Sequence, residues 1–377
     1  MIVNLFFVIL LCFSFSNSNK FNSELDKAIS DLYNFKLDSC IHKLSKLSEQ
    51  NTKDPLIPFL EIAAKWQQIL LHENHNLSYK VIYDGIDSAV PFYLEMIDKY
   101  PNDPSYPLFL GSLYGLKSRI DLAQSNWVDL VISGARGYKY IDTARQIDSL
   151  YYDVYMPIGT LEYFLCRSSS SIQLIGKLFG MQSDCIEAID KLEIASLNSR
   201  FSWIESRNVL SYIYLYIERD YTKALEVSSS IANQFPGHPF FAYLKGEALV
   251  RLERYDDFEK FEKELQRFYL NGPKNQKIEC YDKYMYLKAL IAFQNNKFSE
   301  SEKLCSQIIE SYQLEFKWIL GFAHFIRGKS VEILGNRNKA INDYKKAVEY
   351  LTQYPEYYEA KELLQTPISE IINSTKY

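Results

Sequence analysis

Apolar and small residues recur along this chain with the spacing of helices. Ala340, Tyr344, Ala347 and Leu351 are separated by four, three and four positions, which places their side chains on one face of a helix. Proline ends a helix because it has no N–H to donate and clashes with the preceding turn. The same spacing occurs in two segments that end at a proline: Ala224, Ser228, Ile231 and Phe235 before Pro236, and Ala89, Tyr93, Met96 and Tyr100 before Pro101. These patterns predict amphipathic helices and an all-α fold.

A second pattern repeats on a longer scale. One template recurs in four segments, each followed by a second apolar stripe: Leu110-Gly111-x-x-Tyr114, Ile175-Gly176-x-x-Phe179, Ser211-Tyr212-x-x-Leu215 and Lys245-Gly246-x-x-Leu249. The second position of this template serves as a ruler for the repeat. From the segment at Gly176 onward it falls at residues 176, 212, 246, 289 and 328, at intervals of 34 to 43 residues. Small residues at such positions allow two helices of a pair to cross closely. Each pair buries its apolar face against the next, so the repeat predicts a right-handed α-solenoid of about eight stacked antiparallel helix pairs.

These residues resemble the tetratricopeptide repeat (TPR), in which a Leu-Gly-x-x-Tyr helix is followed by a helix with alanine, an aromatic residue and alanine. Leu110-Gly111-x-x-Tyr114 with Ala123-x-x-x-Trp127, and Gly328 with the Ala340 ladder, carry the resemblance. The repeat at Gly246 departs from it, with Phe258 and Glu262 where alanine and an aromatic residue are expected. The blocks from about 50 to 250 also resemble exported, uncharacterised bacterial TPR proteins and, more distantly, the eukaryotic tetratricopeptide repeat protein 39 group. The resemblance implies a concave binding surface and no known catalytic site.

The central segment, at about 138–181, departs most from the repeat and is rich in tyrosine. Tyrosine tolerates half-exposed sites because its ring is buried while its hydroxyl stays in water. Most tyrosines occupy packing positions of the repeat. Those outside these positions are the candidates for a binding surface: Tyr151, Tyr152, Tyr155 and Tyr163.

The first eighteen residues have the form of a signal peptide. They contain an apolar run of about eleven residues, too short to span a bilayer, followed by Ser16 and Ser18. We expect cleavage after Ser18, which leaves residues 19–377 as a single TPR-like solenoid that is exported and is periplasmic or secreted. Since no second apolar run of eighteen residues follows, the mature chain should be soluble, or membrane-associated if the leader is not cleaved.

The five cysteines that remain are spread along the chain without short spacings: Cys40, Cys166, Cys185, Cys280 and Cys305. This spacing is not that of a disulfide framework, although one pair could join in an oxidising compartment. Cys40 and Cys305 fall at repeat positions that require a small apolar side chain.

Composition and charge argue against nucleic acid as a binding partner. Hydrophobic residues make up 47% of the chain, charged residues make up 24%, and the net charge is −5. Basic and acidic residues alternate, which is not the footprint of a nucleic-acid-binding protein. The mixed run Arg251–Lys263 could be a docking face, but its i,i+4 alternation is more typical of a solvated helix surface.

No candidate chemistry is well supported by local motifs. His72 and His75 are spaced for a shared metal but have no third ligand at a suitable distance, so we predict neither metal nor cofactor. Glu162 could pair with Asp184 or Glu187 as an acid and base, yet no known catalytic signature is present. We therefore predict a protein that is not an enzyme.

The predicted function is a scaffold that binds a protein or peptide partner through a concave helical groove, in the cell envelope or outside the cell. The main alternative is an envelope carrier that binds a small ligand or glycan in a pocket of the tyrosine-rich segment. A hydrolase that uses Glu162 and self-assembly through the end helices are two further alternatives.

Overall fold

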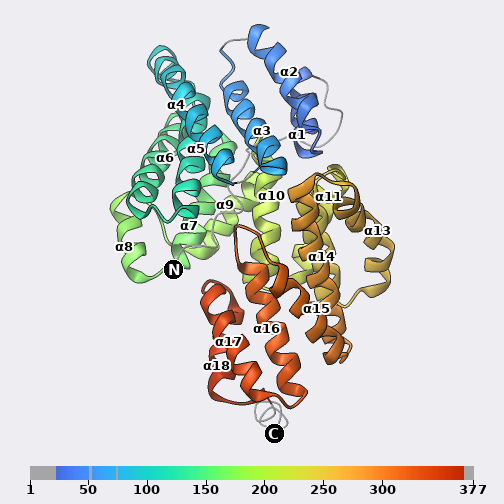
Figure 1. Ribbon diagram of the computed structural model, residues 1–377. Helices are drawn as coiled ribbons and strands as arrows, with labels where there is room; N and C mark the ends of the chain where they lie inside the picture. The colour runs from blue at the N-terminus through green and yellow to red at the C-terminus, as the bar shows by residue number, and fades with distance from the viewer. Residues whose placement is uncertain (1–22, 51–52, 74, 369–377) are drawn as a thin grey trace. The chain divides into compact units, whose positions relative to one another are not determined.

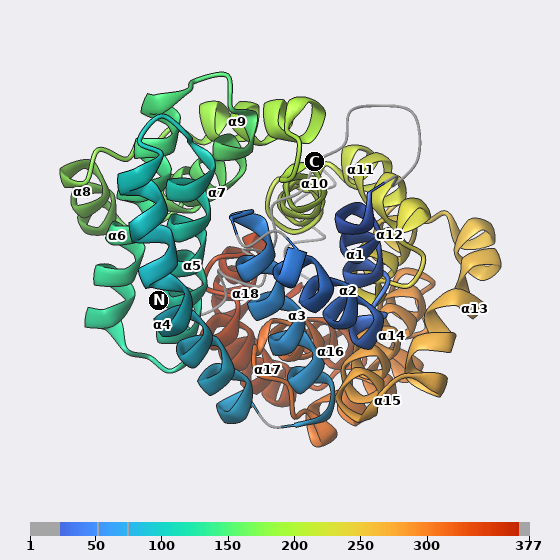
Figure 2. The same cartoon turned by 90° about the horizontal axis from the view of Figure 1, so that it is seen from above.

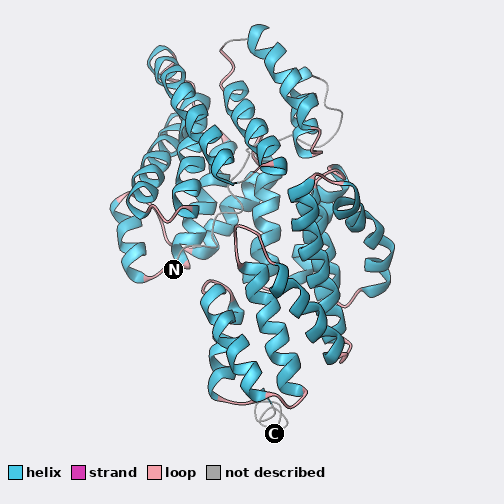
Figure 3. Cartoon of the chain, viewed as in Figure 1, coloured by secondary structure: helices cyan, strands magenta, loops and turns pink. Residues whose placement is uncertain are grey.

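All regular elements of the described chain are helices. The computed structural model describes residues 23–50, 53–73 and 75–368. Within these ranges no strand occurs (Figure 3), so the all-α prediction is confirmed. The predicted signal peptide, residues 1–18, lies outside the described residues.

The chain forms two compact units, each described by itself below. The N-terminal unit comprises the described residues up to 211 together with 230–238, and the C-terminal unit comprises 212–229 and the described residues from 239 onward. The single solenoid over residues 19–377 stays a prediction.

The helices follow one another along the chain as labelled in Figures 1 and 2. Those that begin in the N-terminal unit are α1 (Glu24–Tyr33), α2 (Leu37–Gln50), α3 (Leu56–His72), α4 (His75–Lys99), α5 (Ser105–Ala123), α6 (Trp127–Ile147), the 3-10 turn η1 (Tyr152–Val154), α7 (Tyr155–Cys166), α8 (Ser170–Leu178), α9 (Cys185–Asn198) and α10 (Trp203–Tyr212). Those that begin in the C-terminal unit are the π turn η2 (Ile213–Ile217), α11 (Tyr221–Gln234), α12 (Pro239–Arg251), α13 (Tyr255–Asn271), α14 (Lys274–Gln294), α15 (Phe298–Ser311), α16 (Trp318–Ile333), α17 (Arg337–Tyr350) and α18 (Pro355–Gln365).

Consecutive helices of the N-terminal unit pack as pairs, α1 with α2, α3 with α4 and α5 with α6. Gly111 of α5 lies at the crossing with α6. A Cβ atom at this position would lie 2.7 Å from the carbonyl oxygen of Gly137 and 2.6 Å from Cγ1 of Ile141. Because only a hydrogen atom fits there, the predicted role of Gly111 as a crossing residue is confirmed.

The structure corrects the second half of the same predicted repeat. Ala123 is the last residue of α5 and Trp127 is the first residue of α6, so the two do not share one helix face. Trp127 is 43% exposed. The first helix is longer than the repeat register suggests, and Gly137 therefore takes the position opposite Gly111 that the sequence pattern assigned to Ala123.

A larger correction concerns the predicted repeat at Gly176. The partner of α7 is α9, and α8 is inserted between them along the chain. Gly159 of α7 is the crossing residue, because a Cβ atom there would lie 2.8 Å from the carbonyl oxygen of Ala188 and 3.0 Å from Cγ of Leu192, both in α9. Gly176 belongs to the inserted helix α8, which is labelled on the left in Figures 1 and 2.

A disulfide closes the base of this insertion. Cys166, the last residue of α7, is bonded to Cys185, the first residue of α9, with their Cα atoms 5.6 Å apart. The remaining described cysteines are free. Cys40 and Cys305 are buried, as their repeat positions predict, and burial raises the pKa of both thiols to about 12.

The first helix of the N-terminal unit, α1, packs against residues from the C-terminal end of the same unit. The Tyr33 hydroxyl donates to Oε1 of Glu205 at 2.9 Å, and the Tyr33 ring lies 5.2 Å from that of Phe235. The backbone N–H of Gly237 donates to Oδ1 of Asn34 at 3.0 Å. These contacts join α1 to α10 and to residues 235–237. The first and last segments of this unit are therefore in contact, and the other helix pairs lie between them along the chain.

The C-terminal unit repeats the pairing rule with α12 and α13, α14 and α15, and α16 and α17. The predicted ladder of α17 is buried, with Ala340, Tyr344 and Ala347 all 0% exposed. A Cβ atom at Gly328 of α16 would lie 2.7 Å from Cε1 of Tyr344. The stacked antiparallel pairs expected for a TPR-like fold are thus present within each unit.

The stability of the protein should fall as the pH rises, because of Glu205. Burial raises the pKa of this carboxyl from 4.5 to about 8, so the folded chain keeps a proton that the unfolded chain releases. The free energy of unfolding should therefore decrease between about pH 4.5 and pH 8, by at most about 1.4 kcal/mol per pH unit. Glu205→Gln, which does not titrate, should flatten this decrease in urea unfolding measured at a series of pH values.

The matched control is Glu95→Gln, which changes an exposed glutamate of α4. It should leave the pH dependence of the wild type intact. The same slope for Glu205→Gln as for the wild type would contradict the assignment.

Candidate functional site

The inner side of the C-terminal unit is filled with aromatic rings. Among the first helices of its pairs, α14 contacts both α12 and α16, and α16 also contacts α18. The Tyr216 ring lies 5.1 Å from Trp318, and Phe322 lies 5.1 Å from Tyr354 and 5.8 Å from Tyr286. These rings pack between the helices of this unit, and the concave groove predicted from the sequence stays a prediction.

A buried ion pair lies within this aromatic cluster. The Glu247 carboxylate, 0% exposed, accepts from the hydroxyls of Tyr216 and Tyr243, both at 2.7 Å. It also accepts from Nε and Nη2 of Arg251 at 3.1 and 3.0 Å, and Arg251 donates to the Tyr286 hydroxyl at 2.9 Å. Burial, together with the charge of Glu247, raises the pKa values of the Tyr216 and Tyr243 hydroxyls well above the usual range for tyrosine. Both hydroxyls therefore keep the proton that they donate to Glu247.

The last described helix closes this cluster. Tyr354, just before α18, shares a hydroxyl–hydroxyl hydrogen bond with Tyr212, which lies 142 positions earlier in the chain. Arg219 pairs with Glu356 at 2.9 Å and with Glu359 at 2.6 Å. The start of α18 is thereby fixed against residues 212–219.

An open groove lies on the other side of α12, between α11 and α13. Its volume is about 640 Å³. We call it the outer groove, because it lies on the side of α12 that faces away from the buried cluster. It is lined by Thr222, Leu225, Glu226, Ser229, Lys245, Leu249, Arg254, Asp257, Lys260 and Phe261.

The two faces of α12 separate the groove from the buried cluster. Lys245 and Leu249 line the groove, whereas Glu247 and Arg251 point into the cluster. Two residues along a helix correspond to about 200°, so the two sets lie on opposite sides of the same helix. The ion pair and its tyrosine partners therefore hold in place the helix that forms the floor of the groove.

The groove has an apolar floor and a charged rim. Leu225, Leu249 and Phe261 supply apolar surface. On the rim, Asp257 pairs with Arg254 at 2.5 Å and with Lys260 at 3.4 Å. These three residues belong to the run Arg251–Lys263, for which the sequence favoured a solvated surface. The rim of the groove shows that this run also contributes to a concave site.

Lys245 is the lining residue with the most distinctive surroundings. Its Nζ lies 4.6 Å from the centre of the Phe261 ring, an arrangement in which the ring face attracts the cation. Burial lowers the pKa of Lys245, because part of its hydration is lost.

The departure of this repeat from the TPR pattern coincides with the groove. Phe258, 1% exposed, stands twelve positions after Gly246, where Ala340 stands twelve positions after Gly328. Its ring lies 3.7 Å from the position of a Cβ atom at Gly246. A phenyl ring takes up more room than a methyl group, so we expect it to keep α13 farther from α12 than an alanine would.

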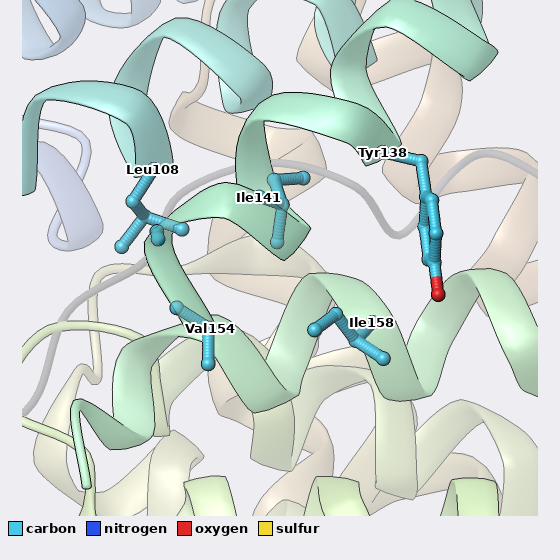
Figure 4. Close-up of a cluster of buried hydrophobic side chains, with 6 residues drawn as sticks. Leu108, Tyr138, Ile141, Val154 and Ile158 are labelled. Atoms are coloured by element: carbon cyan, nitrogen blue, oxygen red, sulfur yellow. The ribbon is translucent and has the colours of Figure 1, made fainter. Parts of the chain in front are cut away.

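The tyrosines predicted as a binding surface have a different place in the structure. Tyr163 is 0% exposed, which corrects its assignment to a surface: the α7 face that carries it is core. Tyr151 and Tyr155 are half-buried against a cluster that joins α5, α6 and α7 and includes Leu108, Tyr138, Ile141, Ala144, Val154 and Ile158 (Figure 4). Tyr152 is also half-buried. Binding by Tyr151, Tyr152 and Tyr155 stays a prediction.

Two acidic residues of the divergent segment have structural partners. Asp153, 1% exposed, accepts from the backbone N–H groups of Arg200 at 3.1 Å and Ser202 at 2.7 Å, at the start of α10. Glu162 pairs with Lys191 and accepts from the backbone N–H of Gln182 at 3.1 Å. Sequence reasoning did not identify Asp153, because its partners lie about fifty positions away.

The other residues considered as catalytic or metal-binding candidates lie at the ends of helices. Asp184 caps α9 by accepting from the backbone N–H groups of Ile186 and Glu187. His72 ends α3 and His75 begins α4. Over the residues that the structure describes, no group of three His, Cys, Asp or Glu side chains could hold a metal ion. None of the helices described above is both long enough and apolar enough to cross a membrane.

Comparison with known proteins gives a weak structural likeness. No family model and no curated protein matches the sequence. Among solved structures, the chain is similar to the crystal structure of yeast Tom70, with 14% sequence identity and a TM-score of 0.35, over 91% of this chain and 80% of that chain. Likeness at this level does not bear on function. The fold assignment rests on the helix pairs described above.

Removing Glu247 should destabilise the protein strongly. In Glu247→Ala the Arg251 guanidinium and two tyrosine hydroxyls lose a buried partner, which should cost about 3–5 kcal/mol in the free energy of unfolding. Glu247→Gln should cost less, because an amide oxygen still accepts. Urea unfolding followed by circular dichroism measures both.

The matched control is Glu359→Ala, which removes a partly exposed carboxylate from its pair with Arg219. Exposed pairs contribute at most about 1 kcal/mol. Equal effects of Glu247→Ala and Glu359→Ala would show that the buried pair does not hold the floor of the outer groove.

Proposed function

We propose that the protein is a TPR-like scaffold that binds an extended segment of a partner protein in the outer groove, without catalysing a reaction. The observation that carries this proposal is the groove itself, which combines an apolar floor with a rim of both charge signs. Its volume of about 640 Å³ is in the range of ligand-binding clefts. A groove between helices suits a chain segment, which buries alternate side chains and leaves the rest in water.

The lining favours a segment in which an apolar residue stands next to an acidic one. Leu225 and Phe261, both half-buried, offer an apolar contact, and the ammonium of Lys245 places a positive charge beside the Phe261 ring. Among the ten lining residues, Lys245, Arg254 and Lys260 are basic and Glu226 and Asp257 are acidic, which leaves one net positive charge. That balance supports an acidic partner.

We propose that the protein acts outside the cytoplasm. An exported protein, periplasmic or secreted, is supported by the leader-like pattern of residues 1–18 and by the disulfide between Cys166 and Cys185. Disulfides persist in oxidising compartments and are rare in the cytosol. The resemblance to exported bacterial TPR proteins belongs to this proposal and rests on the sequence alone.

Selection of random phage-displayed peptides on the full chain tests the groove. We expect enriched peptides to share an apolar residue next to Asp or Glu. Lys245→Glu should weaken their binding about tenfold or more, measured by fluorescence polarisation, because it places a like charge where the carboxylate binds.

Lys303→Glu is the matched control, since it makes the same charge change at an exposed position of α15. It should bind as the wild type does. The proposal fails if no peptide is enriched, or if the two lysine variants bind the selected peptides equally.

Thiol labelling tests the compartment. In protein isolated from its native host under conditions that trap thiols, Cys166 and Cys185 should resist alkylation until a reductant is added, whereas the half-buried Cys280 should react after denaturation alone. Full alkylation of Cys166 and Cys185 before reduction would contradict an oxidising compartment.

A further inference from the structure

Helix α8 presents its apolar side chains outward. Leu174, Ile175, Leu178 and Phe179 are 62%, 45%, 79% and 47% exposed, and Gly176 is the buried residue of the helix. At about 100° per residue, Leu174 and Leu178 point almost directly away from Gly176. An ordinary surface helix buries such a stripe against the core. In α8 the stripe faces away from the protein.

The helix is held firmly in this orientation. A Cβ atom at Gly176 would lie 2.3 Å from Cδ2 of Leu165, so α8 rests directly on the end of α7. The Gln173 side chain donates to the carbonyl oxygens of Cys166 and Ser168 at 2.9 and 3.0 Å. The outward stripe is therefore a fixed feature of the insertion.

The return of the chain from α8 is anchored as well. The Tyr138 hydroxyl donates to the carbonyl oxygen of Gly180 at 3.2 Å, and Met181 packs against the cluster shown in Figure 4. Gly180 has a φ of +81°, a backbone conformation that favours glycine. With the disulfide between Cys166 and Cys185, these contacts fix both ends of the insertion.

The charge of this insertion differs from that of the rest of the chain. Between Cys166 and Asp184 the only charged residues are Arg167 and Lys177, and both are exposed. The chain as a whole carries a net charge of −5. The insertion thus combines two positive charges, no negative charge and an exposed apolar stripe. This combination is complementary to a lipid bilayer, which is apolar inside and can be anionic at its surface.

We propose that the α8 insertion is a membrane-contact site, in which Leu174, Ile175, Leu178 and Phe179 enter the interface of an anionic lipid bilayer. Lys177, next to Leu178 in α8, faces the lipid phosphates, and Arg167, which follows α7, adds a second positive charge to the insertion. The disulfide keeps the insertion folded while its apolar side is exposed to water. This contact is peripheral, and it is independent of the peptide binding proposed above.

A lipid surface suits these residues better than a protein partner. Their side chains stand on a helix of nine residues and on Phe179, the residue that follows it, and a protein would need a matching groove with acidic groups beside it. A second copy of this chain would place the cations of two insertions against each other, which is unfavourable. A bilayer accepts a convex apolar helix without a preformed shape.

Tryptophan quenching tests the site directly. In the full chain carrying Phe179→Trp, added vesicles of brominated phosphatidylglycerol and phosphatidylcholine should quench fluorescence more strongly than in the wild type, because bromine quenches only indoles that enter the lipid. Vesicles of phosphatidylcholine alone should quench less. No additional quenching in the variant, whether or not the protein binds vesicles, would overturn the proposal.

Vesicle sedimentation tests the individual residues. Leu178→Ser with Phe179→Ser should lower partitioning into the anionic vesicles about tenfold or more. Lys177→Glu should lower it severalfold at low salt and less at high salt, because salt screens the attraction. Leu270→Ser, which changes a 59% exposed leucine of α13, is the control and should bind as the wild type does.

Two results would overturn the proposal at this stage. One is equal partitioning of Leu178→Ser/Phe179→Ser and the wild type, with both shown to be folded by circular dichroism. The other is a dimeric wild type that becomes monomeric in this variant by light scattering, which would assign the stripe to self-association.

Discussion

The contacts that close each unit are the constraint on which the rest of the structure depends. In the N-terminal unit, Tyr33 of α1 binds the buried carboxyl of Glu205. In the C-terminal unit, Tyr354 and Glu356 at the start of α18 bind Tyr212 and Arg219. An open array of helix pairs buries each pair only against its neighbours, whereas these contacts join its distant ends. Closure makes the inner helices of the C-terminal unit a packed core.

Closure also decides where a partner can bind. With aromatic rings and the pair of Glu247 and Arg251 on the inner side of α12, the face of this helix that lines the outer groove is the one that carries Lys245 and Leu249. The outer groove forms there, in the repeat that carries Phe258 in place of alanine. The α8 insertion is likewise an exception to the repeat. Both proposed surfaces lie where the chain departs from the regular pairing of small residues.

Much of the fold could be predicted from local spacing. The ladder of Ala340 and the crossing glycines Gly111 and Gly328 were identified because helix pairs need small residues at fixed intervals. The same reasoning assigned Gly176 to a crossing because Phe179 completes its local template, whereas Gly159 has Glu162 at the corresponding position and is shown to face a partner helix only by its tertiary contacts. The filled inner side depends on residues such as Tyr212 and Tyr354, 142 positions apart. Their contact leaves no local signal in the sequence.

Hydrogen–deuterium exchange of the full chain, with and without a selected apolar–acidic peptide, tests the central claim most directly. The account predicts that the peptide slows exchange in residues 222–229 and 254–261, on the two sides of the outer groove. Exchange in residues 318–322 and 354–356 should stay as it is in the free protein, because these segments are already packed. Slower exchange in the latter segments, without change around the outer groove, would contradict a closed inner side.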